Sequence, residues 1–255
     1  MAPETRVLLR AITDSGELAT LTPERVWREL ERALGEAHPQ RFFEVLRDCG
    51  ALRVVLPEVD ALFGVPQPAQ HHPEIDCGAH LLLCLMQATE AGANTRVRFA
   101  LLTHDLGKAT TPTALLPQHI GHEDRSVHLL DGLCDRLRVP QAYRELAVLV
   151  ARHHTNVHRA LELRVSTMVD LFDKIDAYRR PERFEELLLA CECDARGRSG
   201  LEDRPYPQAA RLRAALVITR AVEVAALVAQ HGAGPKIRAL LREARIAALK
   251  AACPD

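Results

Sequence analysis

The residue types best suited to chemistry gather around the pentapeptide His104-Asp105-Leu106-Gly107-Lys108. An isolated histidine, His80, precedes it, and further histidines follow at positions 122, 153 and 154. Imidazole and carboxylate ligands together suit manganese, iron, cobalt, nickel, zinc or, with more carboxylate and water, magnesium. A divalent ion of this kind can activate water against a phosphate ester. The ligand types alone do not select one metal.

Adjacent residues on a helix point about 100° apart, so His104 and Asp105 can share one ion only near a helix end. We expect Gly107 to stop the preceding helix there. His80, His104 and Asp105 then give three ligands, and the fourth should be a carboxylate from a later helix.

Asp194 is the first choice for that fourth ligand because it ends an apolar helix and precedes an Arg-Gly-Arg loop. Asp173 and Asp176 are the alternatives. A lone buried histidine or a helix-terminal aspartate is more often a core residue or a cap, so the doublet alone leaves a structural role open.

The other polar residues near the motif have two readings each. His122, His153 and His154 are expected at one end of a helical bundle, where they would hold a second ion bridged by Asp105 or, with one ion, contact phosphate or act as general acid. Lys108 could reach a phosphoryl oxygen and offset developing charge, or be an ordinary cation at a helix C-terminus. We therefore take Asp105, Lys108, His122 and His154 as candidate catalytic residues.

Apolar residues recur at helical spacing along nearly the whole chain, which predicts an all-α fold. The segment 63–76 contains three prolines and is expected to be an ordered loop, with Asp76 as the cap of the next helix. The helices are expected at 23–34, 39–50, 77–90, 94–106, 122–138, 141–154, 166–178, 182–195, 208–230 and 235–252. No strand competes with them.

Composition narrows the class of protein. With 255 residues and 47% hydrophobic content the chain can bury a large core. The net charge of -1 gives no global argument for nucleic acid, but 205–254 forms a basic region. The seven cysteines lack paired zinc-type spacing, which favours reduced thiols in the cytosol. Without a membrane-spanning run or a signal peptide, we expect a soluble, cytoplasmic protein that does not bind membranes.

Around these residues the sequence resembles an HD-domain metal-dependent phosphohydrolase. The segments 16–27, 47–53, FGVPQPAQHHPEID (63–76) and HDLGKATTP (104–112) resemble bacterial multifunctional CCA proteins more specifically. The similarity continues through 121–123, LFDKIDAYRRPER (171–183) and DARGRSG (194–200), and so covers almost the whole chain. CCA proteins build and repair the CCA end of transfer RNA.

The resemblance implies a helical HD bundle with flanking helices. It implies phosphatase, 2'-nucleotidase and 2',3'-cyclic phosphodiesterase activity, supported by nickel or another divalent ion such as manganese, cobalt or magnesium. By the same resemblance, His80, His104 and Asp105 match the metal positions, Asp194 is the fourth ligand, and His122 and His154 are further histidines near the site. His153 is the weaker match of its pair.

The chain departs from the family in one respect, because no glycine-serine turn with paired aspartates, the mark of a nucleotidyltransferase head, occurs in it. CCA addition is therefore not expected from this chain by itself, whether it is a fragment or a protein encoded without the head. We expect a neck-like helical segment at 1–62, an HD domain at 63–200 and a basic helical tail at 201–255. RNA 3' ends or nucleotides are the expected substrates, with monomer and homodimer both open.

Two other functions fit the sequence. The chain could be chiefly a transfer-RNA-binding module whose basic helices follow backbone phosphates, in which case binding should fall steeply with salt. It could also be a free-standing HD nucleotidase that prefers mononucleotides to RNA ends.

Overall fold

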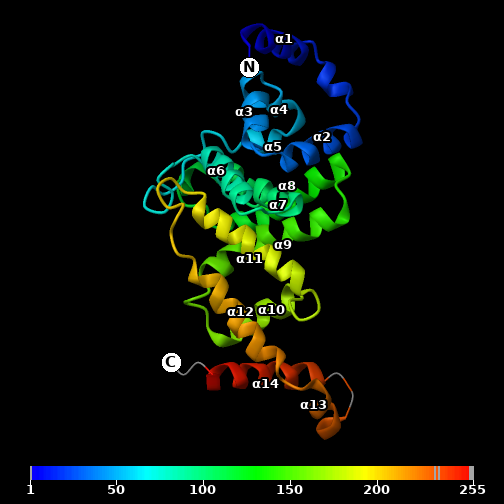
Figure 1. Cartoon of the computed structure of the whole chain (residues 1–255), viewed down its shortest axis with the longest axis vertical. Coiled ribbons are helices and arrows are strands. Elements are labelled where there is room, and N and C mark those ends of the chain that lie inside the picture. The colour runs from blue at the N-terminus through cyan, green and yellow to red at the C-terminus, as the bar shows by residue number, and fades with distance from the viewer. Residues whose placement is uncertain (1, 233, 235, 253–255) are drawn as a thin grey trace. The chain divides into compact units, whose positions relative to one another are not determined.

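The protein is described by a computed structural model that covers residues 2–232, 234 and 236–252 (Figure 1). In these residues the fold is all-α, as the sequence periodicity predicts. The α-helices are α1 (Pro3–Asp14), α2 (Pro23–Gly35), α3 (Gln40–Asp48), α4 (Leu52–Val55), α5 (Pro57–Asp60), α6 (Cys77–Glu90), α7 (Thr95–Thr103), α8 (His122–Leu137), α9 (Gln141–His158), α10 (Val165–Lys174), α11 (Pro181–Arg196), α12 (Pro207–Arg220), α13 (Val224–His231) and α14 (Lys236–Ala252). Three short 3-10 turns are η1 (Glu17–Thr20), η2 (Leu106–Thr110) and η3 (Thr113–Leu115). The β-type pairing found in the described part is an isolated bridge between Pro66 and Asp76.

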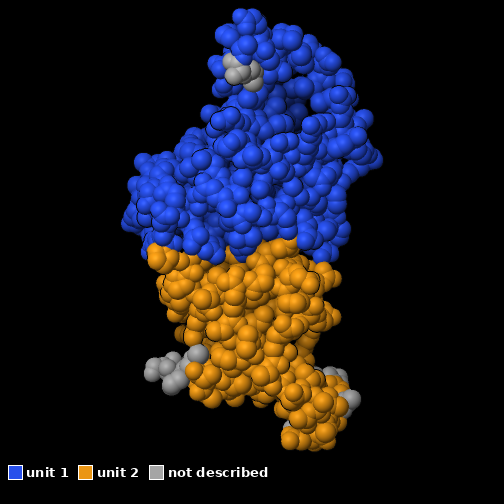
Figure 2. Space-filling model, viewed as in Figure 1, with its two compact units in different colours: residues 1–154, 189–204 blue, residues 155–188, 205–255 orange. Residues whose placement is uncertain are grey.

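The chain folds into two compact units (Figure 2). Unit 1 consists of residues 1–154 and 189–204, and unit 2 consists of residues 155–188 and 205–255. Helices α9 and α11 contribute residues to both units. The predicted division into three domains, with boundaries at 62 and 200, stays a prediction.

The helices around the pentapeptide begin at side-chain caps. The Asp76 carboxylate accepts a hydrogen bond of 2.8 Å from the backbone N–H of Ala79 at the start of α6, which confirms the predicted cap. Asn94 does the same for α7 through the N–H of Val97, at 3.0 Å. Both helices are therefore fixed at the end nearest the loops that precede them.

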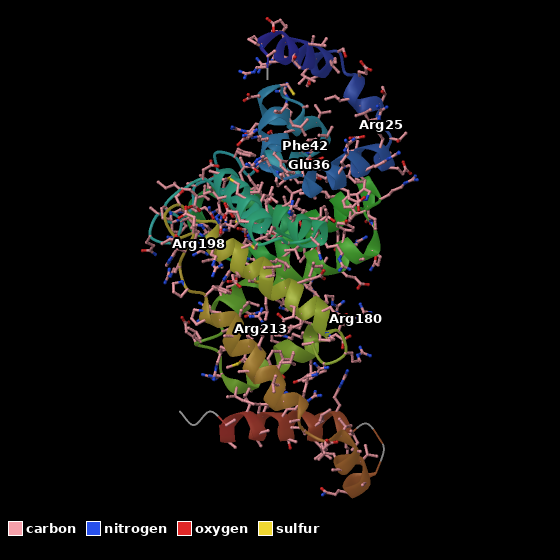
Figure 3. The ribbon with its side chains drawn as sticks, viewed as in Figure 1. Arg25, Glu36, Phe42, Arg180, Arg198 and Arg213 are labelled. Atoms are coloured by element: carbon pink, nitrogen blue, oxygen red, sulfur yellow. The ribbon has the colours of Figure 1, made fainter. Side chains whose placement is uncertain are left out.

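The N-terminal helix α2 packs against α7 within unit 1. Trp27 meets Phe99 and Tyr143 edge to face, with ring centroids 5.3 and 4.9 Å away. The buried guanidinium of Arg98 donates to the carbonyls of Leu34 and Glu36 at the end of α2, at 2.8 and 2.9 Å (Figure 3 labels Glu36). Arg98 thereby satisfies carbonyls that the helix itself leaves unpaired.

Two predicted helix ends near the pentapeptide differ from the structure. Helix α7 ends at Thr103 rather than 106, and Gly107 lies inside η2, where the N–H of Lys108 bonds to the Asp105 carbonyl at 2.9 Å. Helix α9 continues to His158, so His154 lies one turn before its end. A tight 3-10 turn has no marker in the 3.6-residue pattern, which is why the periodicity extended α7 too far.

Two further ends differ in unit 2. Helix α10 stops at Lys174 because Asp176 adopts a left-handed conformation with φ +57°, which aspartate tolerates better than most residues. The predicted helix 208–230 is two helices, α12 and α13, separated at 221–223. The run of alanine, valine and leucine after this break has no single apolar stripe, so sequence periodicity could not mark the change of direction.

In unit 2, helix α14 packs against α10 and α12 and pairs several of its charges internally. Arg242 forms a bidentate pair with Asp170 at 2.6 and 2.9 Å, and Arg245 lies 3.2 Å from Asp173. Arg213 of α12 pairs with Glu185 at 2.7 Å (Figure 3). Part of the basic region between 205 and 254 therefore neutralises acidic groups of its own unit.

Six cysteines lie in the described part of the chain. All six are buried and none of them forms a disulfide, as expected. Cys253 lies outside the described residues. Among the helices of the described segments, none is both long enough and apolar enough to cross a membrane.

Candidate metal centre

Four side chains meet in the interior of unit 1, brought there by three helices and a turn. His80 lies in the first turn of α6, His104 follows the last residue of α7, Asp105 leads into η2, and Asp194 lies near the end of α11. Their exposed fractions are 1%, 1%, 4% and 3%. These are the four residues that the sequence predicts as metal ligands.

The donor atoms of these four side chains lie close to one another. His80 Nε2 lies 2.8 Å from Asp194 Oδ1, and His104 Nε2 lies 3.1 Å from Asp105 Oδ2 and 3.8 Å from Asp194 Oδ1. Neighbouring ligands about 2.1 Å from a metal are roughly 3.0–3.4 Å apart in octahedral or tetrahedral geometry. The distance between His104 and Asp105 lies in this range, the other two lie just outside it, and His80, His104 and Asp194 form a group of residue types that could hold an ion.

The hydrogen bonds of the imidazoles support the same fit. His104 Nδ1 lies 2.8 Å from the carbonyl of Leu101, which can only accept, so this nitrogen carries the proton. The other nitrogen, Nε2, has no hydrogen-bond donor among the described residues, and neither has Asp105 Oδ1. Buried lone pairs that face one another without a donor are costly unless a cation lies between them. Two imidazoles and two carboxylates suit zinc, nickel, cobalt or manganese.

Lys108 is the fixed cation of this cluster. Its Nζ lies 2.6 Å from Asp105 Oδ2 and donates to Gln67 Oε1, also at 2.6 Å. Lys108 is 8% exposed and Gln67 is 2% exposed. The lysine is therefore part of the buried cluster rather than an ordinary helix-end cation.

A second group of possible ligands lies on the other oxygen of Asp105. His122 Nε2 and His154 Nε2 lie 3.3 and 3.7 Å from Asp105 Oδ1, and 3.1 Å from each other. Their Nδ1 atoms lie beside the backbone carbonyls of His119 and Val150, at 2.9 and 3.0 Å. The structure thus brings together four of the predicted histidines, at positions 80, 104, 122 and 154, and His122, with a side chain 13% exposed, is the one nearest the surface.

Burial and neighbouring charges set the protonation of the cluster. Burial by itself would raise the pKa of Asp105, but His104 and Lys108 hold that pKa well below its usual range. Burial would lower the pKa of Lys108, but Asp105 raises it. Burial lowers the pKa of His154 to about 3, whereas the neighbouring carboxylate of Asp105 outweighs burial and raises the pKa of His122. Asp105 is therefore an anion, and Lys108 is its fixed cationic partner.

Glycine allows helix α8 to approach the turn that carries Asp105. A Cβ added to Gly107 would lie 2.2 Å from the carbonyl oxygen of His122 and 2.4 Å from the backbone nitrogen of Ser126. The N–H of Gly107 also donates to Ser126 Oγ at 2.8 Å. The residue that the sequence assigned to helix termination instead permits close contact between η2 and α8, which puts His122 beside Asp105.

Three other candidate residues do not join the cluster. His153 is buried but is absent from the groups of possible ligands that the described residues form. Asp173 and Asp176 belong to unit 2, where Asp173 pairs with Arg245 and Asp176 pairs with Arg179 at 2.7 Å. Of the three aspartates considered for the fourth ligand, Asp194 is thus the one that reaches His80.

Sequence reasoning missed three residues of the proline-rich loop that contact the cluster. Gln67 holds Lys108, and His72 and Glu74 adjoin His80, with Glu74 Oε1 lying 3.0 Å from Nδ1 of both histidines. The signal available was the HHPE segment directly before the helix that carries His80. Its spacing to His80 varies with loop conformation, so no periodic pattern pointed to it.

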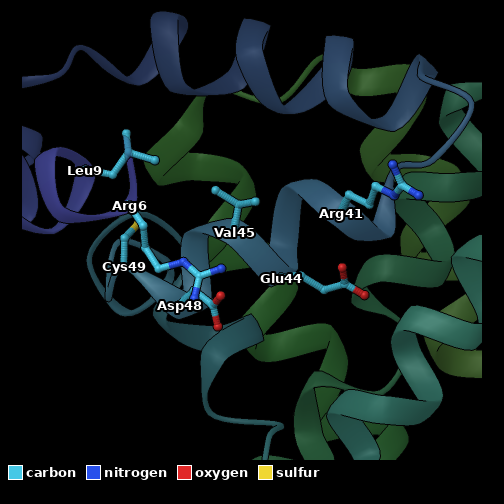
Figure 4. Close-up of a pocket in the computed structure, with 7 residues that line it drawn as sticks. All are labelled: Arg6, Leu9, Arg41, Glu44, Val45, Asp48 and Cys49. Atoms are coloured by element: carbon cyan, nitrogen blue, oxygen red, sulfur yellow. The ribbon is translucent and has the colours of Figure 1, made fainter. Parts of the chain in front are cut away.

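A pocket elsewhere in unit 1 does not contain these groups. It has a volume of about 290 Å³ and lies between α1 and α3, where Arg6, Arg41, Glu44 and Asp48 contribute to its lining (Figure 4). None of the lining residues is a histidine or one of the predicted ligands.

Two segments of the chain match known protein families. Residues 78–195, which include every histidine and aspartate of the cluster, match the HD domain family. Residues 1–63 match a family described as the probable RNA and SrmB-binding site of polymerase A.

Known proteins extend the match over almost the whole chain. The multifunctional CCA protein of Thioalkalivibrio sulfidiphilus is 57% identical over 250 residues, which are 98% of this chain and 61% of that protein. The protein of the same name from Nitrosococcus oceani is 56% identical over 252 residues, or 99% of this chain and 62% of that protein. Another from Burkholderia pseudomallei is 56% identical over 251 residues, or 98% and 60%. The chain spans about three fifths of the length of these relatives.

Proposed function

We propose a function from the premise that this chain belongs with the multifunctional CCA proteins, which it matches over 98% of its own length, and contains an HD domain. The HD domain indicates a metal-dependent hydrolase. The finer assignment, which we propose here, is a phosphohydrolase that acts on phosphate esters: 2',3'-cyclic phosphodiesters, 2'-nucleotides and simple phosphomonoesters.

The observation that carries this proposal is the buried cluster of His80, His104, Asp105 and Asp194, in which His104 Nε2 and Asp105 Oδ1 have no hydrogen-bond partner among the described residues. We propose that these four residues hold a divalent cation, with nickel, manganese, cobalt and magnesium as the candidates. Bound there, the cation would supply Lewis-acid polarisation of a phosphoryl oxygen and acidify water for attack on phosphorus.

The remaining residues of the cluster have roles that follow from their contacts. Lys108 keeps Asp105 anionic and oriented through a 2.6 Å ion pair, and it offsets negative charge that develops on the phosphoryl group. His122 is more exposed than its neighbours, so its Nε2 is placed to contact the phosphoryl group or to give a proton to the leaving oxygen. His154 accepts at Nε2 and fixes the orientation of His122.

Transfer RNA ends are the substrates that we propose for this chemistry. The match of residues 1–63 to an RNA-binding family and the names of the relatives both support an RNA substrate. A strained 2',3'-cyclic phosphate at a single-stranded 3' end would enter a site near the surface more readily than an internal phosphodiester. The activity would then belong to repair of transfer RNA 3' ends.

Hydrolysis assays with purified protein test this proposal. The chain would be stripped of metal, reloaded with nickel, manganese, cobalt or magnesium, and assayed with 2',3'-cyclic AMP, 2'-AMP and an aryl phosphate. We expect metal-dependent turnover of at least the cyclic ester, and loss of that turnover to background in Asp105→Asn.

The matched control is Asp135→Asn, because Asp135 is an aspartate of α8 whose side chain is 71% exposed and paired with Arg144. It should retain wild-type rates. A folded Asp105→Asn protein with full activity on all three esters would reject the proposed site.

A second candidate function is RNA binding without hydrolysis, which the family match at residues 1–63 favours. It predicts salt-dependent binding of transfer RNA by a protein that hydrolyses none of the three esters with any metal. Preference for mononucleotides over RNA ends would instead identify a free-standing nucleotidase.

A further inference from the structure

The proline-rich loop 63–76 places one carboxylate behind the first proposed ligand. Glu74 is nearly buried, with a side chain 4% exposed, and its Oε1 lies 3.0 Å from His80 Nδ1. The same oxygen lies 3.0 Å from Nδ1 of His72, and Oε2 accepts from the backbone N–H of Ser199 at 3.4 Å. Glu74 therefore contacts the ring edge of His80 that faces away from Asp194.

This contact determines which nitrogen of His80 carries the proton. Nδ1 faces two acceptors, Glu74 Oε1 and the carbonyl of Gly197 at 2.9 Å, so the proton lies on Nδ1. Nε2 lies 2.8 Å from Asp194 Oδ1, which is also an acceptor, so a cation bound there would take the place of a proton on Nε2. A carboxylate behind a ligating imidazole fixes the orientation of the ring and makes its other nitrogen a stronger donor to a metal.

The backbone of the loop is strained at the residue that follows Glu74. Ile75 has φ +62°, in a region that β-branched residues rarely adopt, although its side chain is 49% exposed and gains little from burial. The turn is closed by a 2.7 Å hydrogen bond from the N–H of Asp76 to the carbonyl of Glu74, and Gln67 N–H bonds to the Ile75 carbonyl at 2.6 Å. Because Asp76 is fixed as the cap of α6, this turn directs Glu74 inward.

We propose that Glu74 is a positioning residue for the metal centre, which holds the Nδ1–H of His80 so that Nε2 faces the cation. The inference rests on the proposed function, since it assumes that His80 is a ligand. His72, Glu74 and His80 also form a group of metal-ligating residue types, but the carboxylate accepts an N–H from each imidazole, so hydrogen bonds account for that group without a second ion.

Cobalt binding tests the proposal without any activity assay. Metal-free protein is titrated with Co²⁺, and the dissociation constant and the ligand-field absorption band are recorded for the wild type, Glu74→Gln and Glu74→Ala. Loss of a hydrogen-bonding group behind a ligand commonly weakens metal affinity about 10- to 100-fold. We expect Glu74→Ala to weaken Co²⁺ binding by a factor in that range and to shift the absorption band. Glu74→Gln should weaken binding less than Glu74→Ala, because an amide oxygen still accepts a hydrogen bond but carries no charge.

The control is Glu90→Ala, which removes the same charge from an exposed position at the end of α6, where Glu90 contacts Gln87. It should leave the constant and the band unchanged. A folded Glu74→Gln protein that binds Co²⁺ within twofold of the wild type, with the same band, overturns the proposal even if the alanine variant fails to fold. A wild-type protein that binds no Co²⁺ rejects the metal centre itself, which is a different failure.

Discussion

Substitution of Gly107 by alanine should disrupt the site without changing any polar side chain in it. The added Cβ would lie 2.2 Å from the carbonyl oxygen of His122, 2.4 Å from the nitrogen of Ser126 and 2.8 Å from Cβ of Arg125. Ordinary van der Waals contact begins at 3.4 Å, and the two closest atoms belong to the backbone. No side-chain rotation relieves the clash, so α8 must move away from η2 by roughly 1 Å.

The expected cost follows from two losses. Overpacking in a well-packed interior costs about 1–3 kcal/mol. The move also breaks the hydrogen bond from Gly107 N–H to Ser126 Oγ, and an unsatisfied buried donor costs about 1–3 kcal/mol. The free energy of unfolding should therefore fall by roughly 2–6 kcal/mol. Because the shift also carries His122 away from Asp105, the proposed phosphoesterase activity should fall about 100-fold in the fraction that folds.

Trp27 provides the assay. It is the single tryptophan of the chain and packs in unit 1 against Phe99 and Tyr143, so its fluorescence during urea unfolding reports on that unit. The control is Gly132→Ala, since Gly132 lies within α8 with nothing near its added Cβ. Alanine there should stabilise the protein by about 0.5–1 kcal/mol through helix propensity. A Gly107→Ala protein within 1 kcal/mol of the wild type would refute the close approach of α8 to η2.

Three further substitutions test other parts of unit 1. Asp76→Ala removes the cap of α6 and should cost about 1–2 kcal/mol of unfolding free energy, measured by urea titration; an unchanged midpoint would contradict the role of the cap. Ile75→Gly removes the penalty of a positive φ and should stabilise the fold by up to about 1 kcal/mol, whereas destabilisation would mean that the turn is not strained. Lys108→Met leaves Asp105 buried without its cation and should destabilise the metal-free protein by about 3–5 kcal/mol, less in saturating nickel; equal losses with and without metal would argue against a cation at Asp105.

The part of the site that depends on local sequence could be predicted. Asp76 is a side chain of cap type before an apolar run, so it identified the start of α6 and the place of His80 in the first turn. The adjacent His104 and Asp105 needed only a helix end to converge. Asp194 was chosen because it lies near the end of an apolar helix, and the structure places its carboxylate 2.8 Å from His80.

The remaining contacts depend on tertiary structure and had no local signal. Gln67 reaches Lys108 across 41 residues because loop 63–76 folds back over η2. Glu74 lies in the loop before α6, so helical periodicity does not relate it to His80. It reaches His80 through the strained turn at Ile75. Gly107 looked like a helix terminator because glycine serves both purposes, and only the position of α8 shows which one applies.

The orientation of the imidazoles explains why one of them needs a carboxylate from a loop. Three of the histidines place Nδ1 beside the backbone carbonyl of the residue three positions earlier: His104 with Leu101, His122 with His119 and His154 with Ala151. Each segment of chain therefore fixes the tautomer of its own histidine and turns Nε2 toward the cluster.

His80 is the exception. It lies in the first turn of α6, and its Nδ1 is held instead by the carbonyl of Gly197 and the carboxylate of Glu74, both from other parts of unit 1. The orientation of His80 in the proposed metal centre should accordingly depend most on loops 63–76 and 197–204. It should depend least on changes in the helix that carries His80.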